Sequence, residues 1–178
     1  MALRDDTLVQ NRRGFLKSGA GLLAMTIMPS GLIVGNAWAQ MPQSTDPDTF
    51  KTLVQMSRDC YPHAQIEDKY YANAVNILDE AARSSEEELA FLEDNCAKLD
   101  KAAMDAHGVR YSEIPSDDDR TALLKLIETD PFFQKVRGNL VVGLYNQKEL
   151  WPVFGYEGAS ADKGGYMDRG FNDIDWIS

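Results

Sequence analysis

The sequence contains few of the side chains from which catalytic centres are usually built. Histidine and cysteine occur only twice each in 178 residues, as His63, His107, Cys60 and Cys96. No Cys-x-x-Cys-His is present, so a c-type haem has no attachment site here. Dinucleotide-binding, phosphate-binding and Gly-x-Ser-x-Gly motifs are also absent. The sequence therefore predicts a chain with no catalytic residues and no cofactor or metal site of its own.

Positive charge is also scarce. The chain has 18 Lys and Arg against 28 Asp and Glu, which gives a formal net charge of −10. Such a surface repels nucleic acids and anionic lipids, so neither is expected as a partner. The charge favours solubility or docking on a basic face of another protein.

The first 39 residues have the pattern of an export signal. Paired arginines, Arg12 and Arg13, are followed by Phe15 and Leu16, then by an uncharged stretch from Ser18. Residues 37–39, Ala-Trp-Ala, form a small-x-small cleavage site, with Ala37 and Ala39 as the small residues. We expect periplasmic localisation, with the twin-arginine translocase exporting an already folded protein.

A plain Sec signal and a transmembrane anchor are the alternative interpretations of this leader. Arg12-Arg13 followed by Gly-Phe-Leu-Lys resembles the twin-arginine consensus more than a Sec signal. The uncharged run from Ser18 to Ala39 is long enough for a membrane-spanning helix, which needs about 20 residues. Four glycines, Pro29 and Asn36 weaken that interpretation, and no charged stop-transfer sequence follows at once. Cleavage after Ala39 is therefore the expected outcome.

Residues 40–47 form a polar linker, and residues 48–145 predict an all-α bundle of about five helices. The first helix, capped by Asp46 or Asp48, ends at Tyr61-Pro62-His63 because a residue before proline avoids the helical region. The others are expected over about 68–83, from Ser84 or Ser85 to Gly108, from Ser116 to about 127, and from Pro131 to about Tyr145. In the last two of these helices, Leu126 and Val141 are predicted to lie on the apolar face that packs in the core. No segment shows the alternation of a strand.

Residues 146–178 form an irregular tail rich in glycine and aromatic residues. Aromatic side chains on such a chain cannot form a core by themselves. They are expected to lie either on the bundle or on another protein, where aromatic residues are enriched at binding hot spots. The candidate partner-binding residues are Trp151, Phe154, Tyr156 and Tyr166.

Cys60 and Cys96 allow three states. Export permits a disulfide between them, which would close a loop of about 36 residues and stabilise by about 3–4 kcal/mol. Both can equally be free, buried thiols. One of them can also pair with a cysteine of another subunit.

The chain resembles the small third subunit of the gluconate 2-dehydrogenase type, also found as the gamma subunit of FAD-dependent sugar dehydrogenases. The likeness rests on the twin-arginine leader, on Phe50-x-x-Leu53 in the first helix, and on the aromatic helix from Pro131-Phe132-Phe133 to Leu144-Tyr145. It continues in the tail, with Leu150-Trp151, Phe154-Gly155-Tyr156-Glu157-Gly158 and Gly164-Gly165-Tyr166. The order and spacing of these motifs cover nearly the whole chain.

The resemblance implies an accessory subunit that is not itself the oxidoreductase. The expected partner is a large flavoprotein of the glucose–methanol–choline type, which holds FAD and is often accompanied by a multi-haem cytochrome c subunit. The small subunit would supply the export signal, support maturation of the large one, and associate with the membrane through its partners. A tail cysteine that could join the two subunits is absent between Asn146 and Ser178.

Two other functions remain open from the sequence. The chain could be a free-standing periplasmic binding or scaffold protein, with its aromatic tail folded on itself. A small helical enzyme would have to use His63 or His107 together with a carboxylate.

Overall fold

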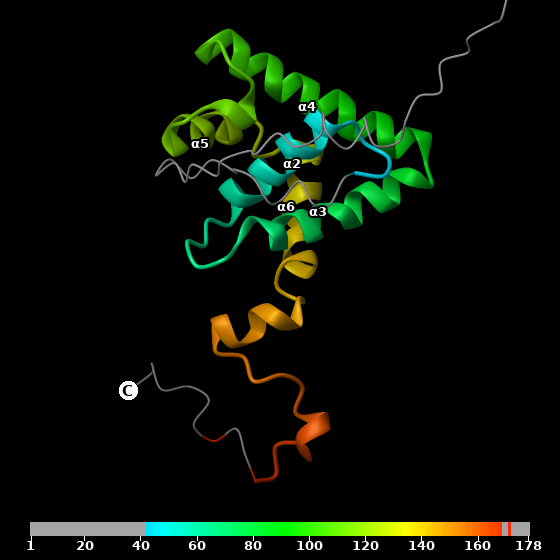
Figure 1. The fold of residues 1–178 in the computed structure, drawn as a ribbon, viewed down its shortest axis with the longest axis vertical. Helices are drawn as coiled ribbons and strands as arrows, with labels where there is room; N and C mark the ends of the chain where they lie inside the picture. Colours follow the sequence, from blue (N-terminus) through cyan, green and yellow to red (C-terminus); the bar gives the residue numbers. More distant parts are fainter. Residues whose placement is uncertain (1–41, 169–170, 172–178) are drawn as a thin grey trace, which may run out of the picture.

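The computed structural model describes residues 42–168 and 171, which form an all-α bundle followed by a largely irregular tail (Figure 1). Its α-helices are α2 (Pro47–Cys60), α3 (Asp68–Arg83), α4 (Glu86–His107), α5 (Asp117–Leu126) and α6 (Pro131–Gly143). Short 3₁₀ helices are η2 (Tyr111–Glu113), η3 (Lys148–Phe154) and η4 (Ala161–Lys163). The predicted fold class is confirmed for this part of the chain. The signal residues Arg12, Arg13, Phe15, Leu16, Ala37 and Ala39 lie outside it.

Side-chain caps begin four of the five α-helices where the sequence predicts, and α3 begins after Glu67 without one. Asp46 accepts hydrogen bonds from the backbone N–H groups of Asp48 and Thr49 at the start of α2. Ser85, Ser116 and Asp130 cap α4, α5 and α6 in the same way. These side chains satisfy backbone donors that have no partner within the helix.

α2 is the central helix and contacts α3, α4, α5 and α6. Phe50, Leu53, Val54 and Met56 on α2 are almost fully buried. They pack in one continuous core with α3 residues such as Tyr71, with Leu92 and Cys96 of α4, and with Phe132 and Val136 of α6. Because the core is continuous, the bundle gains its stability mainly from apolar burial across all five helices.

Two apolar positions do not face the core as expected. Leu126 is 79% exposed, because α5 turns Leu123 and Leu124 inward and ends at Leu126. Val141 is 56% exposed, because α6 buries Phe132, Val136, Leu140 and Gly143 along one face, and Val141 lies beside that face. The predicted apolar face was therefore too wide in both helices.

A buried ionic network ties α2 to α5. Arg120 is 1% exposed and holds the Asp59 carboxylate through two hydrogen bonds, at 2.8 Å from Nε and 3.0 Å from Nη2. Its Nη1 also donates to the Ile114 carbonyl at 2.6 Å, and Tyr111 Oη donates to Asp59 at 2.6 Å. The network satisfies a charge pair that would otherwise be costly to bury.

The carboxylate of Asp79 holds the segment that leads into α2. Asp79 of α3 accepts hydrogen bonds from the backbone N–H groups of Gln43, Ser44 and Thr45 and from the Thr45 hydroxyl. Burial opposes ionisation, but these bonds together lower the pKa of Asp79 below its ordinary value. Within residues 42–168, none of the helices is long and apolar enough to cross a membrane.

Candidate partner-binding surface

The tail begins at an aromatic cluster where α6 ends. The Tyr145 ring packs edge-on against Tyr61 and His63, with centroids 5.6 and 5.7 Å apart. Phe154, from the far end of η3, lies 5.2 Å from Tyr145 and 5.3 Å from His63. The cluster therefore joins the end of α2, the end of α6 and the tail.

His63 belongs to this cluster, and it also lines an open cavity of about 320 Å³ together with Asp59 and Asp117. Its Nε2 lies 2.7 Å from Tyr145 Oη, within hydrogen-bond distance. Burial, together with the positive charge of Arg58, lowers the pKa of His63 below its ordinary value. The ring therefore tends to be neutral, which suits its packing against Tyr145 and Phe154.

His107 lies at the other end of the bundle, in the last turn of α4. Its Nδ1 is 4.0 Å from Asp119 Oδ2, a peripheral contact between the end of α4 and the start of α5. The two histidines are thus placed in separate environments, His63 among aromatic rings and His107 beside the start of α5. No group of three or more potential metal ligands occurs among residues 42–168 and 171.

η3 fastens the first part of the tail to the bundle. Leu150 is buried, and Trp151 Nε1 donates to the Tyr145 carbonyl at 3.2 Å. The backbone then turns at Gly155, whose φ of 72° is accessible to glycine with little strain. This turn brings Tyr156 onto Trp151, with ring centroids 5.1 Å apart.

Beyond this anchor the large apolar side chains remain open to solvent. Phe154 is 37% exposed, Tyr156 49% and Tyr166 60%. Val153, Met167 and Phe171 are exposed as well. In Figure 1 the tail, in orange and red, extends away from the bundle beyond the end of α6. Of the four predicted partner-binding residues, the structure places Trp151, Phe154 and Tyr156 near one another, and Tyr166 further along the tail beyond η4.

The two cysteines are free thiols in the structure and cannot meet. Cys96 Sγ lies 4.0 Å from the Thr49 carbonyl near the start of α2, whereas Cys60 ends the same helix. Thr49 and Cys60 are eleven positions apart, which is about 16 Å along the helix and beyond the reach of a disulfide. An intrachain Cys60–Cys96 bridge therefore does not fit this fold.

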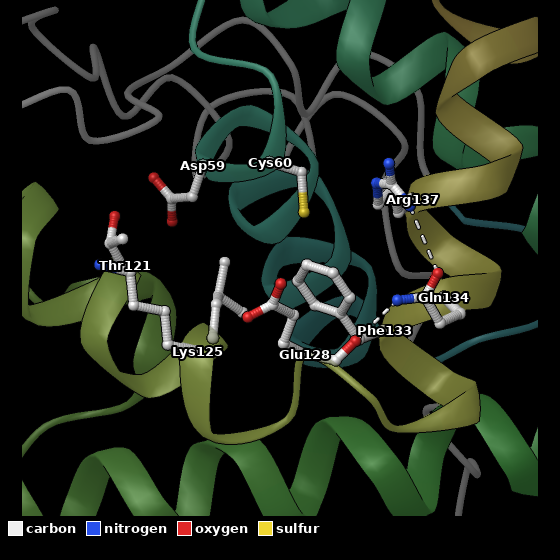
Figure 2. Close-up of a pocket in the computed structure, with 9 residues that line it drawn as sticks. Asp59, Cys60, Thr121, Lys125, Glu128, Phe133, Gln134 and Arg137 are labelled. Atoms are coloured by element: carbon white, nitrogen blue, oxygen red, sulfur yellow. Dashed lines mark hydrogen bonds between the residues drawn. The ribbon is translucent and has the colours of Figure 1, made fainter.

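Cys60 lines an open cavity of about 350 Å³ between α2, α5 and α6 (Figure 2). Phe133 and Leu124 form its apolar side, and Lys125, Glu128 and Arg137 are charged groups in its lining. Burial and the nearby Asp59 raise the pKa of the Cys60 thiol to about 12, with Arg137 acting in the opposite direction. The thiol is consequently protonated at neutral pH and is a poor nucleophile.

Sequence reasoning missed the aromatic cluster and the Arg120 network. The partners His63 and Tyr145 are 82 positions apart, and Asp59 and Arg120 are 61 apart. Only Arg120 left a signal, because it precedes Leu123 and Leu124 at helical spacing and so shares their buried face.

The chain has no match among protein-family models, curated proteins or solved structures.

Proposed function

We propose that this chain is the non-catalytic accessory subunit of a periplasmic flavin-dependent sugar, alcohol or gluconate-type dehydrogenase. It would supply the twin-arginine signal and support maturation of the large subunit, which holds FAD. A multi-haem cytochrome c subunit would be a further partner in complexes that contain one. The observation that carries this proposal is a well-packed bundle with an anchored tail that leaves Phe154, Tyr156 and Tyr166 accessible.

This arrangement suits protein binding for a physical reason. Aromatic side chains contribute large contact areas with few rotatable bonds, and they dominate the energetics of many interfaces. Trp151 and Phe154 are already positioned by the bundle, through the Tyr145 carbonyl and the His63 and Tyr145 rings. A partner would therefore have to order only the more distal tail, which lowers the entropic cost of binding.

The motifs of the resemblance also occupy meaningful places. Phe50 and Leu53 are core residues of α2, and Phe132 and Leu144 are core residues at the two ends of the α6 region. The tail motif contains Gly158, at which an added Cβ would lie 3.4 Å from the Trp151 ring. The motifs thus include residues that stabilise the bundle and a glycine that shapes the tail. A scaffold for binding needs both.

A purification experiment tests the proposal. The tagged full-length chain is isolated from the periplasm of its native host, and the absorption spectrum of the eluate is recorded. We expect a co-purifying polypeptide of dehydrogenase size with a flavin spectrum, and haem bands where a cytochrome is present. A single colourless product would contradict the proposal.

Two variants sharpen this experiment. The double substitution Phe154→Ala/Tyr156→Ala should weaken the complex by at least about 30-fold, as expected for loss of a hot spot. The control Leu126→Ala removes an exposed side chain from α5 and should leave the complex intact.

Replacing Arg12 and Arg13 by lysines should strand the large subunit in the cytoplasm. Its arrival in the periplasm despite that change would refute the export role.

A free-standing periplasmic binding or scaffold protein is the second candidate. The packing of Trp151 against Tyr156 and of Phe154 against Tyr145 favours it, because part of the tail folds on itself and on the bundle. This candidate predicts a stable, colourless monomer in the same purification, with cooperative melting. It also predicts that the double substitution Phe154→Ala/Tyr156→Ala does not change which proteins co-purify with the chain.

A further inference from the structure

The last turn of α6 exposes two apolar side chains near the anchored part of the tail. Val142 is 62% exposed and Val141 lies beside it, also exposed. The helical hydrogen bonding runs on past Gly143, with Asn146 N donating to the Val142 carbonyl at 3.0 Å. Val141 is therefore one turn before Tyr145, whose ring contacts Phe154.

α3 adds a further apolar side chain to this surface. Ile77 is 48% exposed, and its Cδ1 lies 3.1 Å from where a Cβ would stand on Gly143. Ile77, Val141, Val142, Phe154 and Tyr156 are here called the α6–tail surface. It combines side chains of two helices with the anchored part of the tail.

Charge is distributed unevenly around this surface. Residues 131–148 contain no Asp or Glu, although acidic residues outnumber basic ones in the chain as a whole. Residues 84–119, by contrast, contain 11 acidic and three basic side chains. The two regions adjoin, because Lys135 of α6 forms an ion pair with Glu88 in the first turn of α4.

Single exposed apolar residues are ordinary on protein surfaces, so exposure alone decides little. Leu126 is such a case: it is more exposed than Val142 and lies between the charged Lys125 and Glu128. On the α6–tail surface, by contrast, Val141 and Val142 are adjacent, and Val141 lies one turn before Tyr145, whose ring contacts Phe154, so that several apolar side chains gather; Glu149 and Glu157 lie in its tail part. Aromatic enrichment is typical of interface centres, and polar and charged residues such as Lys148 and Glu157 are typical of their rims.

We propose that the α6–tail surface is one interface for a folded protein partner that is apolar at its centre and basic where it meets the first turn of α4. This proposal rests on the proposed function, so the partner is the flavin-bearing large subunit. Its basic groups would meet Glu86 and Glu87, which are exposed in the first turn of α4, the turn whose Glu88 pairs with Lys135 of α6. A second copy of this chain is the rival occupant, and a chain-to-chain crosslink would identify it.

Site-specific photo-crosslinking tests the proposal. A photoreactive phenylalanine analogue is placed at position 142, at position 156 or, as the control, at position 126 of the full-length chain. After irradiation of the complex from the native periplasm, crosslinked products are identified by mass spectrometry and by flavin content. We expect positions 142 and 156 to capture the same flavoprotein and position 126 to capture none.

The other outcomes separate the two proposals. Capture of the flavoprotein from position 156 alone would overturn the role of α6 and leave the proposed function standing. Capture of one protein without flavin from both positions would support a shared interface and refute the dehydrogenase role. No product at position 142, or a chain-to-chain product there, would overturn the proposed interface.

A substitution provides an independent readout. Val142→Glu should weaken binding of the flavoprotein about tenfold or more, because it puts negative charge in the interface centre. Leu126→Glu is the matched control and should bind as the unsubstituted chain does. Thermal melting of both variants should be unchanged, since both side chains are exposed. Equal binding by the two variants would overturn the proposal.

Discussion

Aromatic side chains are buried or partly buried in the bundle, residues 47–143, whereas Phe154, Tyr156 and Tyr166 are exposed in the tail, residues 148–168. Tyr71 and Tyr111 are fully buried, and their hydroxyls donate to the Tyr61 carbonyl and to Asp59. In the tail only Leu150 is fully buried. The difference shows that the bundle meets its own packing and hydrogen-bonding needs, whereas the tail leaves apolar area for another molecule to cover.

The largest effect should come from breaking the bundle's ionic network. Arg120→Met leaves the Asp59 carboxylate buried without its positive partner, so we expect the free energy of unfolding to fall by about 3–5 kcal/mol. Urea denaturation followed by circular dichroism measures this change. Lys125→Met, an exposed change on the same helix, should alter it by less than about 0.5 kcal/mol. A loss below about 1 kcal/mol for Arg120→Met would show that the network is not a stabilising part of the bundle.

A matched pair of phenylalanine substitutions compares the two regions directly. Phe132→Ala removes a ring that is 2% exposed and should cost about 3–5 kcal/mol of unfolding free energy. Phe154→Ala removes a partly exposed ring, so we expect a loss smaller by at least about 2 kcal/mol. Both values come from the same urea experiment. Equal losses would mean that the tail is part of the bundle's core.

Local sequence rules predicted the helices, because each rule acts within a few residues. Asp46, Ser85, Ser116 and Asp130 cap helices as expected, and Gly108 ends α4 with φ of 74°. Such caps depend on backbone donors two or three positions away. This is why the helix boundaries agree with the structure, while α6 ends two residues before the predicted Tyr145.

Packing decides what those rules could not predict. Whether Val141 faces the core depends on how α6 packs on its neighbours, and on the α3 side Gly143 and Asn139 lie close to Ala74. The meeting of His63 with Tyr145 and Phe154 likewise depends on how η3 folds back onto α2. These are contacts between distant parts of the sequence, for which periodicity contains no information.

Two glycines of α6 differ in their surroundings, because Gly143 packs closely on α3 and Gly138 faces open space. At Gly143 an added Cβ would lie 3.1 and 3.2 Å from Cβ and Cα of Ala74, whereas at Gly138 it would meet nothing within 4 Å. Gly143→Ala should therefore destabilise by about 1–2 kcal/mol through overpacking against α3. Gly138→Ala should stabilise by about 0.5–1 kcal/mol through helix propensity. Thermal melting measures both, and a stabilised Gly143→Ala would show that α3 and α6 can separate freely.

The smallest effect should appear at the junction of the two regions, where His63 packs on Phe154. Burial and Arg58 lower the pKa of His63 in the folded protein below its ordinary value of 6.5. As the pH falls through 6.5, the unfolded chain therefore takes up a proton before the folded one, and stability decreases. His63→Gln removes this contribution, so its melting temperature should fall less than that of the unsubstituted chain between about pH 7.5 and 5. Other titrating groups are common to both chains, so parallel pH profiles would show that His63 protonation is not linked to the packing of the junction.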